Sequence, residues 1–254
     1  MSNTQVTLIQ IDNYGPWTVT PAPRREVDLQ TMQSRLFADL SQHFGMQGGY
    51  AFFTRFDNMV AITNGMDLED HARIQESVRN RYPVTVSFGV GHDERPARAL
   101  VEATAQLQDE GSAQDEQRTE VLRGQPIEDD ERTDSDVQIA HYDVVDATGK
   151  YTDELDAFST FIQIEQGYAS LMRHLHDEHG SLAFFVGGDN IIALTSGMDD
   201  AAFEETVTYV REDADVELQV GVGHGATAHD AGMAAKHGLE TCRERGTHIE
   251  GEFC

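Results

Sequence analysis

Residues 53–67 read FTRFDNMVAITNGMD, and residues 185–199 read FVGGDNIIALTSGMD. The two stretches lie 132 positions apart, and each sets an Asp-Asn pair before an apolar run. Further along, residues 86–92 and 218–224 end in the same four letters, GVGH, at the same spacing. Matches that recur in one order in both halves of a chain indicate an internal duplication.

The first strand of each half precedes this stretch. The apolar pattern aligns Val6–Asp12 with Val137–Asp143, an offset of 131 positions. We therefore expect Asp12 and Asp143 to occupy equivalent places, each at the end of a first strand.

Each half reads as strand, helix, hairpin, helix, strand and helix, judged from the spacing of its apolar residues. This order predicts an α+β fold, a tandem duplication of a ferredoxin-like or palm domain with an antiparallel sheet and helices on one face. We expect a first domain at 1–109, an acidic linker at 110–135 with a short helix around 115–124, and a second domain at 136–254. The elements expected in the first half are a strand at 5–12, a helix at 26–43, a hairpin at 50–56 and 59–64, a helix at 68–80, a strand at 83–91 and a helix at 95–109. Those of the second half are a strand at 136–143, a helix at 153–178, a hairpin at 182–196, a helix at 200–212, a strand at 216–223 and a helix at 227–244.

The charge balance is strongly acidic, with 45 Asp and Glu against 18 Lys and Arg and a formal net charge of -27. A nucleic-acid-binding protein would show the opposite sign. No apolar run approaches the roughly 18 residues that cross a bilayer, and no signal-peptide pattern opens the chain. Cys242 and Cys254 offer no disulfide framework. We expect a cytoplasmic protein, bound neither to nucleic acid nor to a membrane, whose surface is adapted to concentrated salt that screens its carboxylates.

Aspartates mark two points of each half, the end of the first strand and the turn of the hairpin. These points are neighbours in the predicted sheet, so Asp12 is expected to meet Asp57, and Asp143 to meet Asp189. Mg²⁺ takes one or two protein carboxylates and completes its shell with water and phosphate oxygens. The same residues would also serve as plain turn formers or helix caps. The duplicated pairing makes a metal site as well supported as that interpretation, and both stay open from the residues alone.

Glycine and arginine suggest how an anionic ligand could bind so acidic a chain. Gly187 and Gly188 would let the backbone approach a ligand closely. Arginine binds phosphate through two parallel N–H donors. The candidate phosphate-binding residues are Arg24, Arg25, Arg55, Arg79 and Arg81. His174, His176 and His179 are predicted to form a solvated helix end rather than a zinc site, since their spacing does not align them on one face.

Residues 9–21 read IQIDNYGPWTVTP and are followed by Arg24-Arg25-Glu26. Together with four shorter motifs they resemble archaeal GTP cyclohydrolase III over nearly the whole chain. The shorter motifs are TRFDN at 54–58, NRYP at 80–83, GSAQD at 111–115 and GGDN at 187–190.

The resemblance implies two palm-like domains related to nucleotidyl cyclases, usually assembled as a homo-oligomer. It also implies Mg²⁺-dependent conversion of GTP to a formylamino-pyrimidine ribonucleotide monophosphate and two phosphates, a step toward riboflavin and deazaflavin cofactors. We predict metal binding by Asp12, Asp57, Asp143 and Asp189, with Asp12, Asp57 and Asp189 catalytic. The predicted nucleotide-binding residues are Asn13, Arg24, Arg25, Arg55, Asn58, Gly187, Gly188 and Asn190.

Two other functions remain open from the sequence. Nucleotidyl and diguanylate cyclases share the palm scaffold, but they carry a carboxylate directly after the Gly-Gly-Asp run, where this chain has Asn190, and Asn58 in the first half. A non-catalytic GTP sensor is the second alternative.

Overall fold

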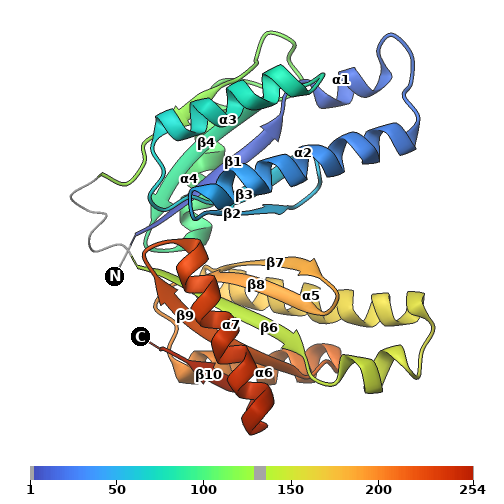
Figure 1. The fold of residues 1–254 in the computed structure, drawn as a ribbon, viewed down its shortest axis with the longest axis vertical. Coiled ribbons are helices and arrows are strands. Elements are labelled where there is room, and N and C mark those ends of the chain that lie inside the picture. The colour runs from blue at the N-terminus through green and yellow to red at the C-terminus, as the bar shows by residue number, and fades with distance from the viewer. Residues whose placement is uncertain (1–2, 129–135, 254) are drawn as a thin grey trace. The chain divides into compact units, whose positions relative to one another are not determined.

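A computed structural model describes residues 3–128 and 136–253, and these residues form two compact units (Figure 1). The first unit comprises residues 3–94 and 98–128, and the second comprises residues 95–97 and 136–253. No helix in these described ranges is long and apolar enough to span a membrane.

The first unit is built on a five-stranded sheet in the order β2-β3-β1-β4-β5. The central strand β1 (Thr4–Ile11) pairs antiparallel with β3 (Asn58–Ile62) on one side and β4 (Val86–Asp93) on the other. The hairpin partner of β3 is β2 (Tyr50–Phe53), and β5 (Leu122–Gly124) runs parallel to β4 at the edge.

Helices cover both faces of this sheet. Apolar residues of α2 and α3 share one core with Ile9 and Phe88. On the opposite face α4 packs so closely on β4 that a Cβ at Gly89 would lie 2.1 Å from the Ala103 carbonyl oxygen. The helices are α1 (Tyr14–Val19), α2 (Glu26–Met46), α3 (Leu68–Arg81) and α4 (Pro96–Gln108).

The second unit has a sheet in the order β7-β8-β6-β9-β10. Here β6 (Val137–Val144) is central and pairs antiparallel with β8 (Asn190–Thr195) and β9 (Leu218–Gly225). The outer strands are β7 (Leu182–Gly187), antiparallel to β8, and β10 (Ile249–Gly251), parallel to β9. The strand order and directions therefore match those of the first unit.

The helices of the second unit also lie on both faces of their sheet (Figure 1). Residues of α5 and α6 share a core with Tyr142 and Val220, while α7 covers the other face. The elements are a short π-helix η2 (Thr148–Thr152), α5 (Ala157–His179), α6 (Asp200–Ala214) and α7 (Ala228–Arg245).

The aspartates that close the repeated stretch start helices. Asp67 accepts the Asp70 backbone N–H and forms a capping box at the start of α3. Asp199 accepts the Ala202 N–H at the start of α6 in the same way. A side-chain acceptor at this position satisfies a backbone donor that the first turn leaves free.

The structure corrects the sequence prediction at four points. Both sheets are mixed rather than antiparallel, and helices cover both faces rather than one. Residues 115–124 form no helix; they contain turns and β5, so part of the expected linker completes the first sheet. The segment 13–25 contains α1. Residues 129–135 of the expected linker lie outside the described residues.

The alignment of the two first strands is also corrected. Gln10 lies opposite Asn58 and Ser87, whereas Asp143 lies opposite Asn190 and Gln219. Because the partner strands correspond at an offset of 132, the register makes Gln10, not Asp12, the counterpart of Asp143. The first strands therefore correspond at an offset of 133 rather than 131, and Asp12 corresponds to Val145.

Candidate active site

The second unit brings two predicted metal ligands together where the end of β6 lies beside the β7–β8 turn. We call this place the corner of the unit. Asp143 is the penultimate residue of β6 and is almost wholly buried, and Asp189 lies in the turn between β7 and β8. Burial raises the pKa of the Asp189 carboxyl, and the negative charge of Asp143, within hydrogen-bonding reach, raises it further. The two carboxylates thus repel each other, and the charge of Arg243 offsets part of this repulsion.

The turn beside this pair depends on its glycines. Gly187 has a φ of 109° and Gly188 a φ of 66°, both in the left-handed region that side chains disfavour. The ladder is irregular between Phe185 and Gly187, so the strand bends as it enters the turn. A Cβ at Gly187 would meet nothing within 4 Å, which leaves the backbone open to a ligand.

Asn190 is held between two side chains of the corner. The His141 Nε2 donates to Asn190 Oδ1 at 2.9 Å, and Asn190 Nδ2 donates to Asp189 Oδ1 at 3.0 Å. Burial lowers the pKa of His141; the hydrogen bond to Asn190 and the charge of Asp143 oppose this shift, and the charges of Lys236 and Arg243 add to it. The imidazole thus holds the Asn190 amide in place.

Cationic side chains of α7 face the same corner. Arg243 Nη2 donates to Asp143 Oδ2 at 2.9 Å, and Gln219 Nε2 donates to the same oxygen at 2.8 Å. Lys236, one of two lysines in the chain, lines a hollow of about 450 Å³ with Arg243. The other lining residues are His141, Val186, Gly187, Asn190, Leu239 and Glu240.

Sequence reasoning missed these α7 residues. Lys236, Glu240 and Arg243 share one helix face, since they are spaced four and three apart. The rarity of lysine in the chain was the signal that could have drawn attention to Lys236.

The corresponding corner of the first unit lacks the paired carboxylates. Gln10 stands where Asp143 stands in the second unit, and its Nε2 donates to Asn58 Oδ1 at 3.1 Å. The Arg118 Nη2 donates to Gln10 Oε1 at 2.9 Å. The Asp57 carboxylate lies 3.5 Å from the Arg55 guanidinium. In the first unit, amides and a guanidinium group thus stand where the second unit has its strand aspartate, and Arg55 pairs with the hairpin aspartate.

Asp12 has other partners. Its carboxylate accepts the hydroxyls of Thr85 at 2.7 Å and Ser87 at 2.5 Å, and the Glu120 N–H at 2.9 Å. The buried Arg118 guanidinium lies 4.0 Å from it. None of these side-chain contacts involves Asp57, although the preceding Ile11 N–H donates to the Asp57 carbonyl at 3.0 Å, so the end of β1 lies beside the hairpin turn.

Most of the arginines predicted to bind phosphate in the first unit contact other surface side chains. Arg24 stacks over the Trp17 ring at 4.0 Å, and Arg25 forms a bidentate pair with Asp28. Ion pairs also hold Arg79 to Glu120 at 2.9 Å and Arg81 to Asp39 at 3.0 Å.

Asn13 adopts a left-handed backbone, with a φ of 49°. Its N–H donates to the Ala113 carbonyl, which attaches the opening motif to the segment 111–115. Two of the motifs that carry the family resemblance in this unit, 9–21 and 111–115, are therefore packed together.

The histidines of α5 were predicted to be solvent-exposed at the end of a helix, and the structure corrects this prediction. His174 is buried and stacks on Tyr209 with ring centroids 4.3 Å apart, while His179 lies 5.5 Å from it. Only His176 is well exposed, and it contacts Asp177. The described residues contain no group of three or more His, Cys, Asp or Glu placed to hold a metal.

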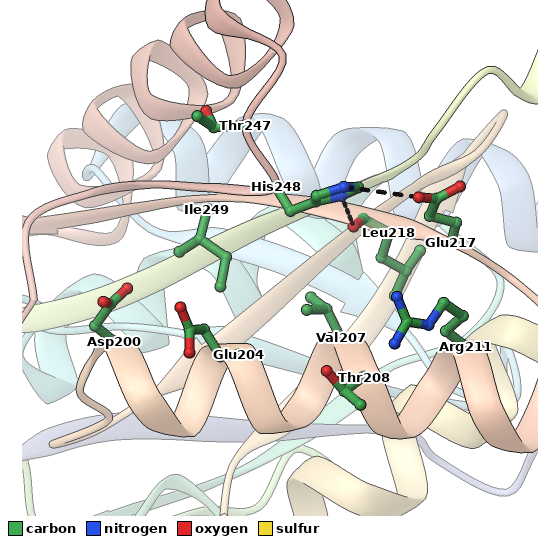
Figure 2. Close-up of a pocket in the computed structure, with 10 residues that line it drawn as sticks. All are labelled: Asp200, Glu204, Val207, Thr208, Arg211, Glu217, Leu218, Thr247, His248 and Ile249. Carbon is green, nitrogen blue, oxygen red and sulfur yellow. Dashed lines mark hydrogen bonds and ion pairs between the residues drawn. The ribbon is translucent and has the colours of Figure 1, made fainter.

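A second hollow, of about 470 Å³, lies between α6 and the start of β10 (Figure 2). Figure 2 shows Asp200 and Glu204 at one end and Arg211 beside Glu217 at the other. In the first unit Gln75, at the position equivalent to Val207, bridges this gap by donating to the Val86 and Val121 carbonyls. None of the predicted site residues lines this hollow.

The fold and the corner define a two-unit α+β protein with one charge-dense site, where paired carboxylates, a glycine turn and cationic side chains converge. Residues 6–254 match the family model of GTP cyclohydrolase III, and the chain belongs to this family.

Relatives from haloarchaea are similar over almost their full length. The chain is 67% identical to GTP cyclohydrolase III 1 of Halobacterium salinarum over 250 residues, covering 98% of each chain. It is 68% identical to GTP cyclohydrolase III of Natronomonas pharaonis, covering 98% of this chain and 99% of the relative. Among solved structures, the GGDEF-containing DgcB fragment from Caulobacter crescentus gives a TM-score of 0.40 at 12% identity, covering 47% of this chain and 71% of that one. That likeness is too weak to carry an argument about ancestry.

Proposed function

We propose that this protein is a GTP cyclohydrolase that opens the imidazole ring of GTP and hydrolyses its triphosphate. The product would be 2-amino-5-formylamino-6-ribofuranosylamino-4(3H)-pyrimidinone 5'-phosphate with two phosphates. The observation that carries the proposal is the Asp143–Asp189 pair beside the Gly187–Gly188 turn, in a chain of the GTP cyclohydrolase III family. One water adds at C8 of the purine and the C8–N9 bond breaks, which leaves the formyl group on N7, and two further waters cleave the two phosphoanhydride bonds.

The donor set of this corner fits Mg²⁺. Asp143 and Asp189 supply the one or two carboxylates that Mg²⁺ takes from a protein, and their mutual repulsion favours a cation between them. Asp143 is already paired with the Arg243 guanidinium, so the corner is organised around positive charge. When bound, Mg²⁺ would neutralise phosphate charge and activate water for attack. The first-unit corner, with Gln10 in place of an aspartate, fits this ion less well.

The chain's own groups would bind and orient the triphosphate. Backbone N–H groups of the Gly187–Gly188 turn can approach phosphate oxygens without a side chain in the way. Arg243 and Lys236 would offset the phosphate charge in the hollow beside the turn. The Asn190 amide, held by His141, is our candidate for contact with the purine.

We also infer that the two units arose by tandem duplication of a palm-like domain. The matching strand order, including a parallel fifth strand in each sheet, supports this inference. The loss of the β-strand aspartate in the first copy, where Gln10 stands, indicates that the copies have diverged. Location in the cytoplasm, assembly as a homo-oligomer and a place in flavin and deazaflavin synthesis are parts of the same proposal.

The test is incubation with GTP and Mg²⁺ in concentrated KCl, following purine absorbance and free phosphate. Loss of the purine chromophore with release of two phosphates supports the proposal. A cyclic nucleotide product would instead indicate a cyclase, and binding without turnover a sensor.

Variants then locate the chemistry. We expect Asp143→Asn and Asp189→Asn to lower kcat by at least about 100-fold, because they remove charge from the metal corner. Asp57→Asn is the matched control at the equivalent hairpin position, and it should change kcat by less than about threefold. Equal losses in Asp57→Asn and Asp189→Asn would reject the assignment to the second unit.

A further inference from the structure

Two histidine rings at the end of α5 each hold a buried nitrogen without a polar partner. His174 keeps only 7% of its surface exposed, and His179 is the last residue of the helix. The Nε2 atom of each ring is buried, and neither has a hydrogen-bond partner among residues 3–128 and 136–253. Buried polar atoms of native proteins are nearly always satisfied, so two such nitrogens on neighbouring rings indicate a bound ligand.

The spacing of the two rings suits a single metal ion. Their centroids lie 5.5 Å apart, and their planes are inclined by 69°. A metal–nitrogen bond of about 2.0–2.1 Å places an ion roughly 3.2 Å from the centre of the imidazole that binds it. Two imidazoles on one tetrahedral ion therefore have centroids about 5.2 Å apart, close to the separation in this structure.

The first unit satisfies its equivalent histidine in another way. Buried positions of α2 and α5 match at an offset of 131, as 40 with 171 and 44 with 175, so His43 is the counterpart of His174. The His43 Nε2 forms a hydrogen bond with the Ser77 hydroxyl at 2.9 Å. The second unit has Tyr209 at the position of Ser77, and its ring stacks on His174 with centroids 4.3 Å apart. The hydroxyl partner of the first unit is thus absent from the second, where another histidine ring lies nearby instead.

We propose that His174 and His179 bind one divalent transition-metal ion through their Nε2 atoms, with water molecules completing its coordination. Imidazole nitrogen is a ligand for Zn²⁺, Cu²⁺ and Ni²⁺, whereas Mg²⁺ takes oxygen ligands. The site therefore differs in its chemistry from the candidate active site, and the ion takes no part in the proposed reaction. It fixes the end of α5 against α6.

The surrounding charge favours a cation at this place. Glu205, Glu178 and Asp199 lie near enough to His179 for their negative charges to act on it. Glu205 precedes Tyr209 by one helical turn and so lies on the face of α6 that contacts His174. The described chain offers the ion no set of three protein ligands, so we expect an exchangeable ion rather than the closed four-ligand site of a structural zinc.

Isothermal titration of the chelator-treated full chain with Zn²⁺, in concentrated KCl with excess Mg²⁺, tests this proposal. The Mg²⁺ occupies carboxylate sites, so that the Zn²⁺ signal reports binding to imidazole. We expect one Zn²⁺ per chain and a midpoint of thermal unfolding that rises with Zn²⁺ concentration. His174→Gln and His179→Gln should each lower the Zn²⁺ affinity by at least about tenfold, because each removes one of the two protein ligands. His176→Gln is the matched control, since this exposed histidine lies on the same helix and contacts Asp177.

Far-ultraviolet circular dichroism of each chelator-treated variant checks folding separately. If His174→Gln disturbs the buried stack on Tyr209, the partly buried His179 decides the result through His179→Gln alone. Equal Zn²⁺ affinities for the wild-type protein and His179→Gln would place the ion elsewhere and overturn the proposal. A wild-type protein that shows no saturable Zn²⁺ binding in excess Mg²⁺ also overturns it.

Discussion

At the residue scale, the Asp12 carboxylate joins three segments of the first unit. It receives hydroxyl groups from Thr85 and Ser87 and the N–H of Glu120, just ahead of β5. It is also the nearest negative charge to the buried Arg118 guanidinium, whose Nε and Nη1 have no hydrogen-bond partner among the described residues. Asp12 therefore positions the segment that completes the sheet edge.

We expect Asp12→Ala to lower the free energy of unfolding by about 3 kcal/mol, because it leaves a buried guanidinium without its counter-charge. Asp12→Asn should cost less, since the amide oxygen can still accept two of the hydrogen bonds. Urea unfolding in concentrated KCl measures both values. A variant with wild-type stability and no turnover would return Asp12 to the role of a metal ligand.

The partly buried His179 at the end of α5 predicts a pH dependence of stability. Burial lowers the pKa of His179, and the neighbouring His174 adds to this effect, while Glu205, Glu178 and Asp199 oppose it. The unfolded chain thus binds a proton at a higher pH, near 6.5, than the folded chain does. This contribution to stability is full above about pH 6.5 and is lost as the pH falls below that value.

The measurement is the free energy of unfolding between pH 8 and pH 5. We expect His179→Gln to flatten its decline by up to about 1.4 kcal/mol per unit of pKa shift removed. The exposed His176→Gln serves as the control on the same helix. Identical slopes for the two variants would show that the decline comes from other groups.

At the element scale, the contact between β9 and α7 sets the position of the candidate site. A Cβ at Gly221 would lie 2.0 Å from the Ala235 carbonyl oxygen and 2.2 Å from the Leu239 nitrogen, both on α7. The same helix carries Lys236 and Arg243 into the corner. The glycine thus allows the helix to lie directly on the strand.

Gly221→Ala should therefore push α7 away from the sheet and destabilise the protein by about 1–3 kcal/mol. Turnover should fall as well, because the cationic side chains move with the helix. Gly45→Ala on α2 is the control, since a Cβ there meets nothing within 4 Å. Thermal unfolding and kcat are the readouts, and a Gly221→Ala enzyme with full stability would contradict the close packing.

The same scale shows what the sequence could and could not predict. Apolar spacing located the long helices and the central strands within a few residues, because burial of one face imposes that spacing. The register of the first strands was missed, since offsets of 131 and 133 differ by two residues and keep every side chain on the same sheet face. The sequence match of Asp12 with Asp143 then favoured the wrong offset. The three-residue strands β5 and β10 are too short to show a period.

The site was predictable to a similar degree. Asp143 and Asp189 lie on elements that are adjacent in any sheet of this order, so their meeting followed from the strand pattern. Arg243 reaches Asp143 from a helix 100 residues further along the chain. The packing of glycines against α7 decides which face of the helix contacts the sheet and where along the strands it lies. No local sequence pattern encodes that packing.

At the scale of the whole molecule, the net charge of -27 on 254 residues makes stability depend on salt. Many carboxylates lie on the surface without a cationic partner, because acidic residues outnumber basic ones by 45 to 18. Their mutual repulsion is spread over distances comparable with the Debye length, which is about 3 Å at 1 M salt and about 30 Å at 0.01 M. Dilution therefore turns a screened repulsion into one that acts across each unit and favours the unfolded chain.

We expect the midpoint of thermal unfolding to fall by more than about 10 °C between molar KCl and dilute buffer, with loss of helical circular dichroism at the lowest salt. Sucrose at matched water activity separates two causes, because it is excluded from the protein surface but does not screen charge. If screening dominates, sucrose restores little of the lost stability while KCl and NaCl restore it equally. A protein that keeps its full stability in dilute buffer would show that the acidic surface is not an adaptation to salt, and the charge would then need a binding partner to explain it.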